Sequence, residues 1–174
     1  MRKCRICNST KFLARGEDRC LSCLTAGIEK WSLIIGSDPD CKLSGYAEWD
    51  IKQQRLTSVA KYSFFEIFDV LEAQRAEIAL VRIEAGWLNK KSNFHGRPGQ
   101  SKAAGERIAK NVGSNHETGK KLVEMANYLD LKVEEVKPLG TKSFDSKQFK
   151  KVTGWSSRTN QDMRDAAMLV FNYK

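Results

Sequence analysis

The stretch that decides the fold is SLIIGSDPDCKLSGYAEWD, residues 32–50. An apolar run at 33–35 leads into Gly-Ser-Asp-Pro-Asp, and a second strand-like run, YAEW at 46–49, follows within a few residues. Two such runs joined by Gly, Pro and Asp predict antiparallel strands with a tight connection. Asp38, at the mouth of the first strand, is either a turn residue or a metal ligand. The second interpretation requires further carboxylates elsewhere in the chain.

Composition points to a globular protein with a polyanionic partner. The chain has 174 residues, 41% of them apolar, which fits one core domain plus a small appendage. Lys and Arg number 30 against 21 Asp and Glu, so the net charge of +9 suits nucleic acid. No apolar stretch approaches the roughly 18 residues of a membrane span, and no apolar signal core begins the chain. We therefore expect a soluble, cytoplasmic protein without a membrane partner.

Four of the five cysteines form two pairs near the start of the chain. CRIC and CLSC are separated by twelve residues and supply four thiolates: Cys4, Cys7, Cys20 and Cys23. This spacing predicts a zinc ribbon over residues 1–28, with one structural Zn²⁺ whose tetrahedral shell is full. A disulfide pair would need an oxidising compartment, and a redox CxxC would not need the second pair. The basic hairpin between the pairs could contact DNA, contact a partner, or only pin the N-terminus.

The rest of the chain, residues 29–174, predicts a single α/β domain. Apolar runs predict strands at 31–37, 43–50, 54–59, 78–83 and 131–136. Helical spacing predicts helices at 63–74, capped by Ser63, over a long region that ends near Leu129, at 144–152 and at 159–171. Residues 89–100 and 138–141 are expected to be loops. The order predicts a mixed five-stranded sheet flanked by helices.

Acidic residues stand at the ends of predicted elements. Asp38 closes the first strand, Glu84 closes the fourth, and Asp162 and Asp165 lie three apart on one face of the last helix. In that helix a stripe of Met and small apolar residues predicts packing on the sheet, namely Met163, Ala166, Ala167 and Val170. The two aspartates lie beside the edge of this stripe, so a close approach of the helix would carry them to the strand ends.

Each of these acids also has a purely structural interpretation. Asp162 follows Thr159 by three residues and could complete a capping box. Asp165 could pair with Arg164 or with a neighbouring helix. Glu84 could be a strand-end residue that faces solvent. Taken together these interpretations weaken, because acids in this order along a chain occur in a known fold.

The chain resembles the RuvC-type Holliday junction resolvases of the RNase H-like nuclease superfamily. IIGSDPDCKLSGYAEWD is similar to the first-strand motif of that family, VRIEAGW to its second acidic motif, and DMRDAAMLVF to its Asp-x-x-Asp-Ala helix. EVKPLGTKSFDSKQFKKVTGW resembles the basic segment before that helix. The resemblance covers about residues 31–171, and the wording RTNQ-x-x-RDAAMLVF is most similar to phage-encoded members. The zinc ribbon departs from the usual bacterial enzyme.

The resemblance implies an RNase H-like sheet and a nuclease site that holds two Mg²⁺ ions, for which Mn²⁺ should substitute. Its ligands would be Asp38, Glu84, Asp162 and Asp165. Hard divalent cations prefer carboxylate oxygens, and a cluster of four acids without metal is disfavoured by like-charge repulsion. Two ions about 4 Å apart can activate water and stabilise the leaving oxygen of a phosphodiester. No histidine is needed as a base, so His95 and His116 are expected in a loop and on the surface.

The resemblance also implies residues that contact DNA. Lys147 is similar to a basic residue near the scissile phosphate, or it is simply a surface lysine on a helix. Trp87, three residues after Glu84, would stack on a base at the junction centre, or it is a core residue under the following helix. Further basic residues are expected on phosphates: Lys90, Lys91, Arg97, Lys102 and Lys142.

Three functions follow from these patterns. The first is a crossover junction endodeoxyribonuclease that cuts four-way and branched DNA by paired nicks, which implies a symmetric homodimer. The second is a general or RNA–DNA hybrid nuclease of the same superfamily. The third is a zinc-ribbon DNA-binding protein whose nuclease-like domain is inert. The acidic residues do not separate the first two.

Overall fold

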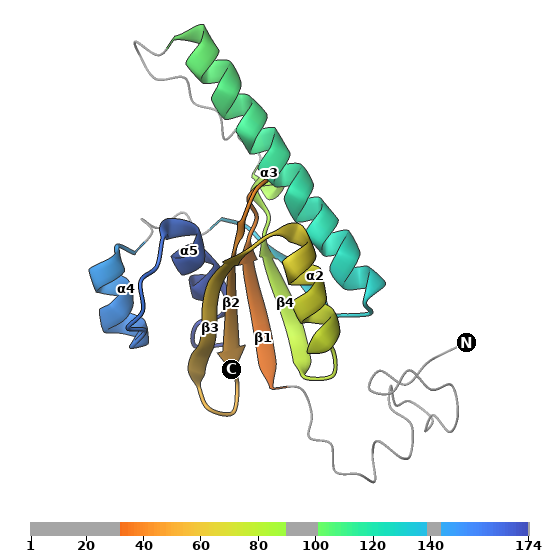
Figure 1. Cartoon of the computed structure of the whole chain (residues 1–174), viewed down its shortest axis with the longest axis vertical. Coiled ribbons are helices and arrows are strands. Elements are labelled where there is room, and N and C mark those ends of the chain that lie inside the picture. Colours follow the sequence, from red (N-terminus) through yellow and green to blue (C-terminus); the bar gives the residue numbers. More distant parts are fainter. Residues whose placement is uncertain (1–31, 90–100, 139–143, 174) are drawn as a thin grey trace.

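A computed structural model describes residues 32–89, 101–138 and 144–173 (Figure 1). Within these ranges no helix combines the length and the apolar character that a membrane crossing requires. The predicted zinc ligands Cys4, Cys7, Cys20 and Cys23 lie outside the described residues, as do Lys90, Lys91, His95, Arg97 and Lys142.

One mixed five-stranded sheet forms the centre of the structure, as predicted. Its strands are β1 (Leu33–Asp38), β2 (Ser44–Asp50), β3 (Arg55–Tyr62), β4 (Ile78–Glu84) and β5 (Val133–Val136). Their order across the sheet is β3-β2-β1-β4-β5. β1 to β3 form an antiparallel meander, whereas β4 runs parallel to β1 and β5 parallel to β4. The carboxyl ends of β1 and β4 therefore lie side by side at one edge.

The meander is held by aspartate-capped turns of the predicted kind. After β1, the Asp40 carboxylate accepts the backbone N–H of Lys42 at 2.9 Å. After β2, the buried Asp50 accepts the N–H groups of the next turn at 2.8 Å, and Gln54 completes that turn with a φ of 51°. β3 ends at Tyr62, three residues beyond the predicted strand, and leads directly into the next helix cap.

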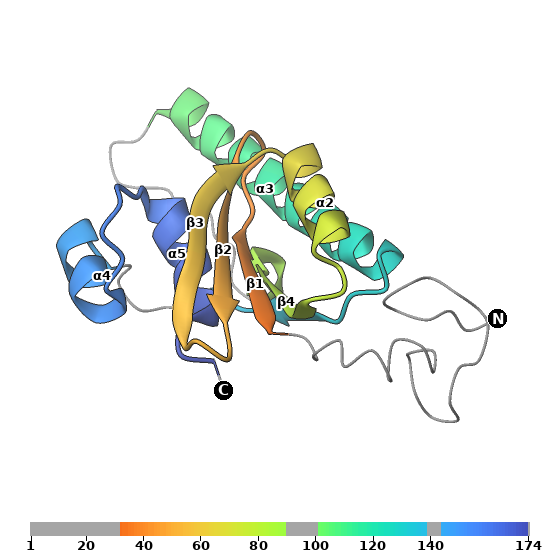
Figure 2. The same cartoon turned by 60° about the horizontal axis from the view of Figure 1, so that its bottom comes forward.

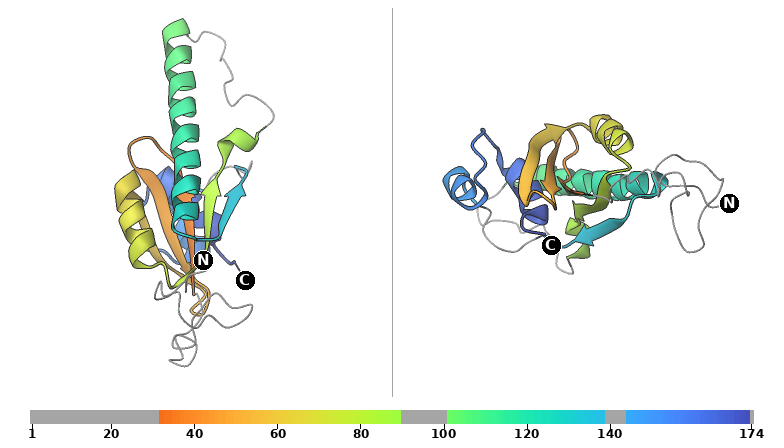
Figure 3. Two further views of the ribbon diagram at one scale, coloured as in Figure 1. Left: turned by 90° about the vertical axis from the view of Figure 1, so that its right-hand side faces the viewer. Right: turned by 90° about the horizontal axis from the view of Figure 1, so that it is seen from below.

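Helices α2 (Phe64–Ala73) and α3 (Lys102–Tyr128) cover one face of the sheet (Figure 3). Ser63 caps α2 as predicted, and Glu66 completes a capping box. An apolar stripe near the end of α3 and at its C-cap is buried in the core: Leu122, Met125, Ala126 and Leu129. Phe65 shares the helical spacing of its neighbours in the sequence but is 76% exposed, and Ile67 fills the core position instead. The N-terminal part of α3 projects beyond the sheet (Figure 1).

Helix α5 (Gln161–Val170) packs on the opposite face, and α4 (Ser146–Thr153) stands to the side of the sheet next to α5 (Figure 2). The second core cluster lies here and includes Phe149 of α4 together with Ala166, Ala167 and Val170 of α5. The predicted small-residue stripe of the last helix therefore does face the sheet. α5 begins two residues later than predicted, because Asn160 rather than Thr159 is its N-cap and accepts the N–H of Met163 at 3.0 Å.

Candidate active site

Asp38 and Glu84 are the last residues of two parallel neighbouring strands. Ser37 pairs with Ile83, so the next residue of each strand brings the two carboxylates to adjacent positions at the same edge. Residues that alternate along a strand point to opposite faces, and those directly opposite each other share one face. Ile34 of β1 belongs to the core under α5, whereas Ile35 belongs to the other core. Asp38, four residues after Ile34, therefore points to the α5 face.

Two glycines allow α5 to lie almost directly on the strands. A Cβ atom at Gly36 would come within 2.2 Å of the carbonyl oxygen of Ala166, and one at Gly45 within 2.0 Å of the carbonyl oxygen of Asp162. Both obstacles are helix backbone, so no rotamer change could relieve them. The first turn of α5 therefore rests on β2 at Gly45, which is paired directly with Asp38 of β1. This contact carries Asp162 and Asp165 to the strand ends.

The four acids lie close enough for their charges to influence one another. Burial, reinforced by the carboxylates of Glu84, Asp162 and Asp165, raises the pKa of Asp38 from 3.8 to about 8. Burial and the charge of Asp165 likewise raise the pKa of Glu84. The structure thus places the four acids that the sequence singled out within electrostatic reach of one another, and a nearby cation would lower the free energy of their ionised forms.

Two of the acids are held by side chains that the sequence did not suggest. The Lys61 Nζ lies 2.7 Å from Asp162 Oδ2, and the Gln161 Nε2 donates to Asp165 Oδ1 at 2.8 Å. The capping box proposed for Asp162 is not formed, because α5 is capped by Asn160.

Arg164, one of the two partners suggested for Asp165, does not pair with it. The guanidinium of Arg164 is buried and points away, donating to the carbonyl oxygens of Phe144 and Thr159 at 2.8 and 3.1 Å. The Asp165 carboxylate accepts a hydrogen bond from Gln161 of its own helix.

The chemistry of this donor set fits a hard divalent cation. Four carboxylates supply only oxygen, the ligand atom that Mg²⁺ and Mn²⁺ prefer. Within residues 32–89, 101–138 and 144–173, no three metal-ligating side chains converge closely enough to hold an ion. Asp162 and Asp165 are instead directed to Lys61 and Gln161. A bound ion would need these two carboxylates to turn toward Asp38 and Glu84.

A pocket of about 180 Å³ opens beside the acids, between the strand ends and α3. Its lining comprises Asp38, Pro39, Glu84, Gly86, Trp87, Val112, Asn115, His116 and Pro138. His116 is therefore not a plain surface residue, as the sequence had suggested, but a wall of this pocket. Its ring meets Trp87 edge-on, with centroids 6.1 Å apart. Gly119, about one turn after His116, is a feature of the sequence that could have indicated this contact. It has no side chain, so α3 can lie close to Trp87.

The indole of Trp87 lies under α3. A Cβ atom at Gly119 would come within 2.5 Å of its six-membered ring, and Trp87 Nε1 donates to Glu135 Oε2 at 2.8 Å. This packing matches the interpretation of Trp87 as a residue beneath the following helix. The indole also lines the pocket, so base stacking stays a prediction.

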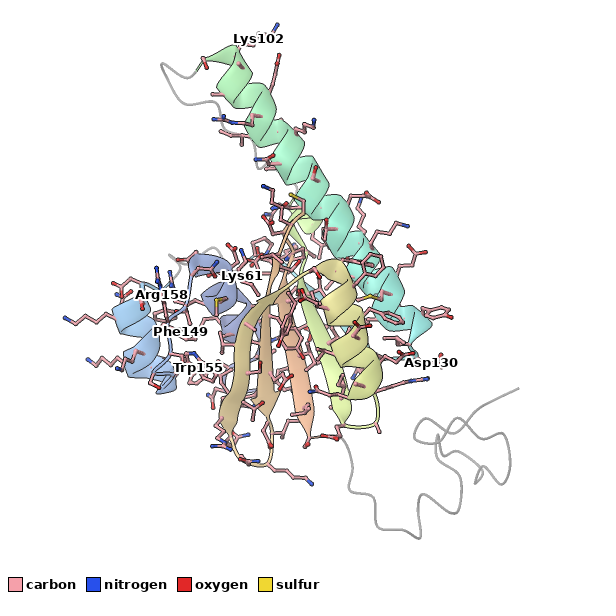
Figure 4. All side chains as sticks on the ribbon, in the orientation of Figure 1. Lys61, Lys102, Asp130, Phe149, Trp155 and Arg158 are labelled. Carbon is pink, nitrogen blue, oxygen red and sulfur yellow. The ribbon has the colours of Figure 1, made fainter. Side chains whose placement is uncertain are left out.

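Two of the basic residues predicted to contact DNA, Lys102 and Lys147, are among the described residues. Lys147 is exposed on α4, and no hydrogen bond or ion pair of the described residues joins it to the four acids. Lys102 is the first residue of α3, its side chain is 92% exposed, and it stands at the far tip of the projecting part of the helix (Figure 4). Their roles on DNA remain predictions.

Comparison with known proteins supports the fold. No family model matches the chain, and no curated protein matches it in sequence. Among solved structures, RuvC of T. thermophilus in complex with a Holliday junction substrate is similar, with a TM-score of 0.51 and 15% identity over 80% of this chain and 90% of that chain. A second Thermus thermophilus RuvC structure matches with a TM-score of 0.44 and 14% identity, over 80% of this chain and 91% of that one. At such identity the likeness shows the fold alone. The mixed five-stranded sheet with flanking helices is an α/β arrangement consistent with an RNase H-like fold.

Proposed function

We propose that this protein is a divalent-metal-dependent DNA endonuclease that resolves four-way junctions. One observation carries the proposal: β1, β4 and α5, which are far apart in the sequence, bring four carboxylates into one field at one edge of an RNase H-like sheet. This arrangement raises the pKa of Asp38 to about 8, because burial and the neighbouring carboxylates disfavour its ionised form. Such an unfavourable arrangement of acids is typical of a functional site, and a bound metal ion would offset the repulsion.

The residues of the chain would divide the work as follows. Asp38 and Glu84, fixed at adjacent strand ends, and Asp162 and Asp165, on the first turns of α5, would hold two Mg²⁺ ions. When bound, these ions would supply an activated water and stabilisation of the departing oxygen. The pocket walls formed by α3 would keep the DNA strand against the acids, and Lys147 on α4 would hold a phosphate.

Three further features support the choice of branched DNA. The net charge of +9 favours a polyanion. One similar solved structure is T. thermophilus RuvC in complex with a Holliday junction substrate. Trp87, together with Lys90, Lys91, Arg97, Lys102 and Lys142, would contact the opened junction. Paired nicks across a two-fold DNA object require two sites, so we propose a symmetric homodimer.

The N-terminal segment has a separate proposed role. Cys4, Cys7, Cys20 and Cys23 would bind one structural Zn²⁺ over residues 1–28, outside the nuclease domain of residues 29–174. Four thiolates fill the zinc shell, so this ion would take no part in hydrolysis. The basic residues between the cysteine pairs would add a DNA contact.

A substrate panel tests the proposal. End-labelled four-way junction, fork, linear duplex and RNA–DNA hybrid are incubated with the full chain and Mg²⁺. We expect paired nicks in the junction and little cutting of linear duplex. Equal cutting of duplex or preference for the hybrid would contradict junction resolution and favour the general nuclease. Absence of cutting of every substrate would favour the inert DNA-binding protein.

The D38N variant tests the site itself. We expect cleavage by D38N to fall by about 10²-fold or more, because the substitution removes one ligand of the metal site. D38N should still bind junction DNA, because the fold is kept. D69N is the matched control, since Asp69 is exposed on α2, an element on the opposite face of the sheet. Unchanged cleavage by D38N would remove Asp38 from the site.

A further inference from the structure

Lys61 stands in the same cross-strand row as Asp38. In the register of the sheet, Gly45 of β2 pairs with Lys61 on one side and with Asp38 on the other. Residues directly opposite each other share a face of the sheet, so Lys61 and Asp38 flank Gly45 on the α5 face. The first turn of α5 rests on Gly45. A positive charge and a buried carboxylate therefore lie on the two sides of the helix end that carries Asp162.

Asp162 interacts with both sides of this row. Its Oδ2 lies 2.7 Å from Lys61 Nζ, and its charge contributes to the raised pKa of Asp38. The pair is only partly shielded, with side-chain exposures of 28% for Lys61 and 36% for Asp162. An ion pair of this exposure can be exchanged for another partner, because it is weak and screened. Figure 4 shows Lys61 near the N-terminal end of α5.

We propose that Lys61 is the resident counter-ion of the acidic site, which holds Asp162 away from Asp38 and Glu84 until a divalent ion takes that carboxylate. Lys61 is thus a positioning residue that competes with the metal and raises the divalent-ion concentration needed for cleavage. The inference rests on the proposed function, since it needs a metal ion at these acids.

An alternative role for the pair makes the opposite prediction. If Lys61 only braced α5 against β3, its loss would loosen Asp162 and weaken metal binding. If Lys61 competes, its loss frees a carboxylate and removes a like charge from the neighbourhood of the ion, so metal binding becomes tighter. The sign of the change in metal affinity separates the two roles.

The test compares Mn²⁺ binding by the full chain and its variants, followed by electron paramagnetic resonance of the free ion. K61M removes the charge and keeps most of the apolar stem, and K61Q is a second uncharged variant in case K61M does not fold. K61R keeps the charge. K121M is the matched control, because Lys121 makes an ion pair of the same 2.7 Å length with Glu124 on α3. D38N measures binding outside the site, and cleavage is recorded against Mg²⁺ concentration for each variant.

We expect K61M and K61Q to bind Mn²⁺ about three- to tenfold more tightly than wild type, which is the range for release of one partly exposed ion pair. Their Mg²⁺ midpoint for cleavage should fall by a similar factor, whereas K61R and K121M should match wild type. Unchanged or weaker Mn²⁺ binding by K61M and K61Q would overturn the inference and leave the proposed function standing. Equal Mn²⁺ binding by wild type and D38N, with no cleavage, would overturn the proposed function and this inference with it.

Discussion

The two faces of the sheet are built in different ways. On the face covered by α2 and α3, large apolar side chains such as Ile35, Ile83 and Leu122 keep the helices at a full side-chain distance. On the face covered by α5, Gly36 and Gly45 let helix backbone meet strand backbone. Each face has its own apolar core cluster, and the close approach on the thin face sets the position of the acids.

The contrast shows why the site lies where it does. Carboxylates have short side chains, so acids on a helix can share a field with acids on strands only if the helix comes very close. Gly45 provides that closeness at the first turn of α5, where Asp162 begins the acidic pair. A substitution on the thin face should therefore affect function beyond its effect on stability, whereas one in the apolar core of the thick face, away from the pocket, should affect stability alone.

The largest effect on cleavage is expected from side chains added to the thin face. G45V, and to a lesser degree G45A, should displace α5, because their Cβ would lie 2.0 Å from the Asp162 carbonyl oxygen. Overpacking against backbone costs about 1–3 kcal/mol or more of unfolding free energy. We expect lower thermal stability and loss of cleavage even in the fraction that stays folded, measured by calorimetry and by single-turnover nicking.

G113A is the control for this experiment. Gly113 lies within α3, and a Cβ there meets nothing within 4 Å. Alanine in a helix interior should stabilise the protein by about 0.5–1 kcal/mol. If G45A behaved like G113A, the close approach of α5 would not be needed for the site.

A cavity on the thick face should lower stability without lowering activity. L122A removes a side chain that is 1% exposed and packed between α3 and the sheet. Such changes cost about 2–5 kcal/mol of unfolding free energy. Denaturant unfolding should show this loss, while the cleavage rate per folded molecule should match wild type. A cleavage loss as large as that of G45A would erase the distinction between the faces.

The stability of the protein should also depend on pH. The pKa of Asp38 is about 8 in the folded protein against 3.8 for an ordinary aspartate, so the folded state binds the proton more tightly. The free energy of unfolding of the metal-free protein should therefore fall as pH rises from about 4 to about 8. D38N should make this dependence on pH less steep. Part of the dependence should remain in D38N, because the pKa of Glu84 is also raised. An equally steep slope in D38N and wild type would show that Asp38 is not the cause.

Much of the thin face could be predicted from the sequence. Asp38 and Glu84 follow clear apolar runs, and parallel neighbours bring their ends together. Asp162 and Asp165 follow helical spacing beside a stripe of small residues, which indicated close packing. Apolar runs and helical spacing are local patterns, and the strands and the helix that they predict are present in the structure.

The partners of the acids could not be predicted in the same way. The third strand was expected to end at residue 59, because a lysine before a helix cap carries little strand signal, and Lys61 was therefore missed. His116 lies on the part of α3 that meets the loop after β1, where Cys41 donates its N–H to Asn115 at 3.1 Å. The sequence has no apolar stripe at this contact between α3 and the loop after β1. The angle at which α3 crosses the sheet decides which of its residues face the pocket, and that angle could not be predicted from the sequence.

The central claim is that α5 completes a divalent-cation site on the ends of β1 and β4. Its most direct test is anomalous X-ray diffraction from crystals of the protein soaked in Mn²⁺, with D38N crystals as the control. We expect anomalous density between Asp38, Glu84, Asp162 and Asp165, with Asp162 turned away from Lys61, and no such density in D38N. Wild-type crystals that show no Mn²⁺ among these four carboxylates at a saturating concentration would contradict the claim.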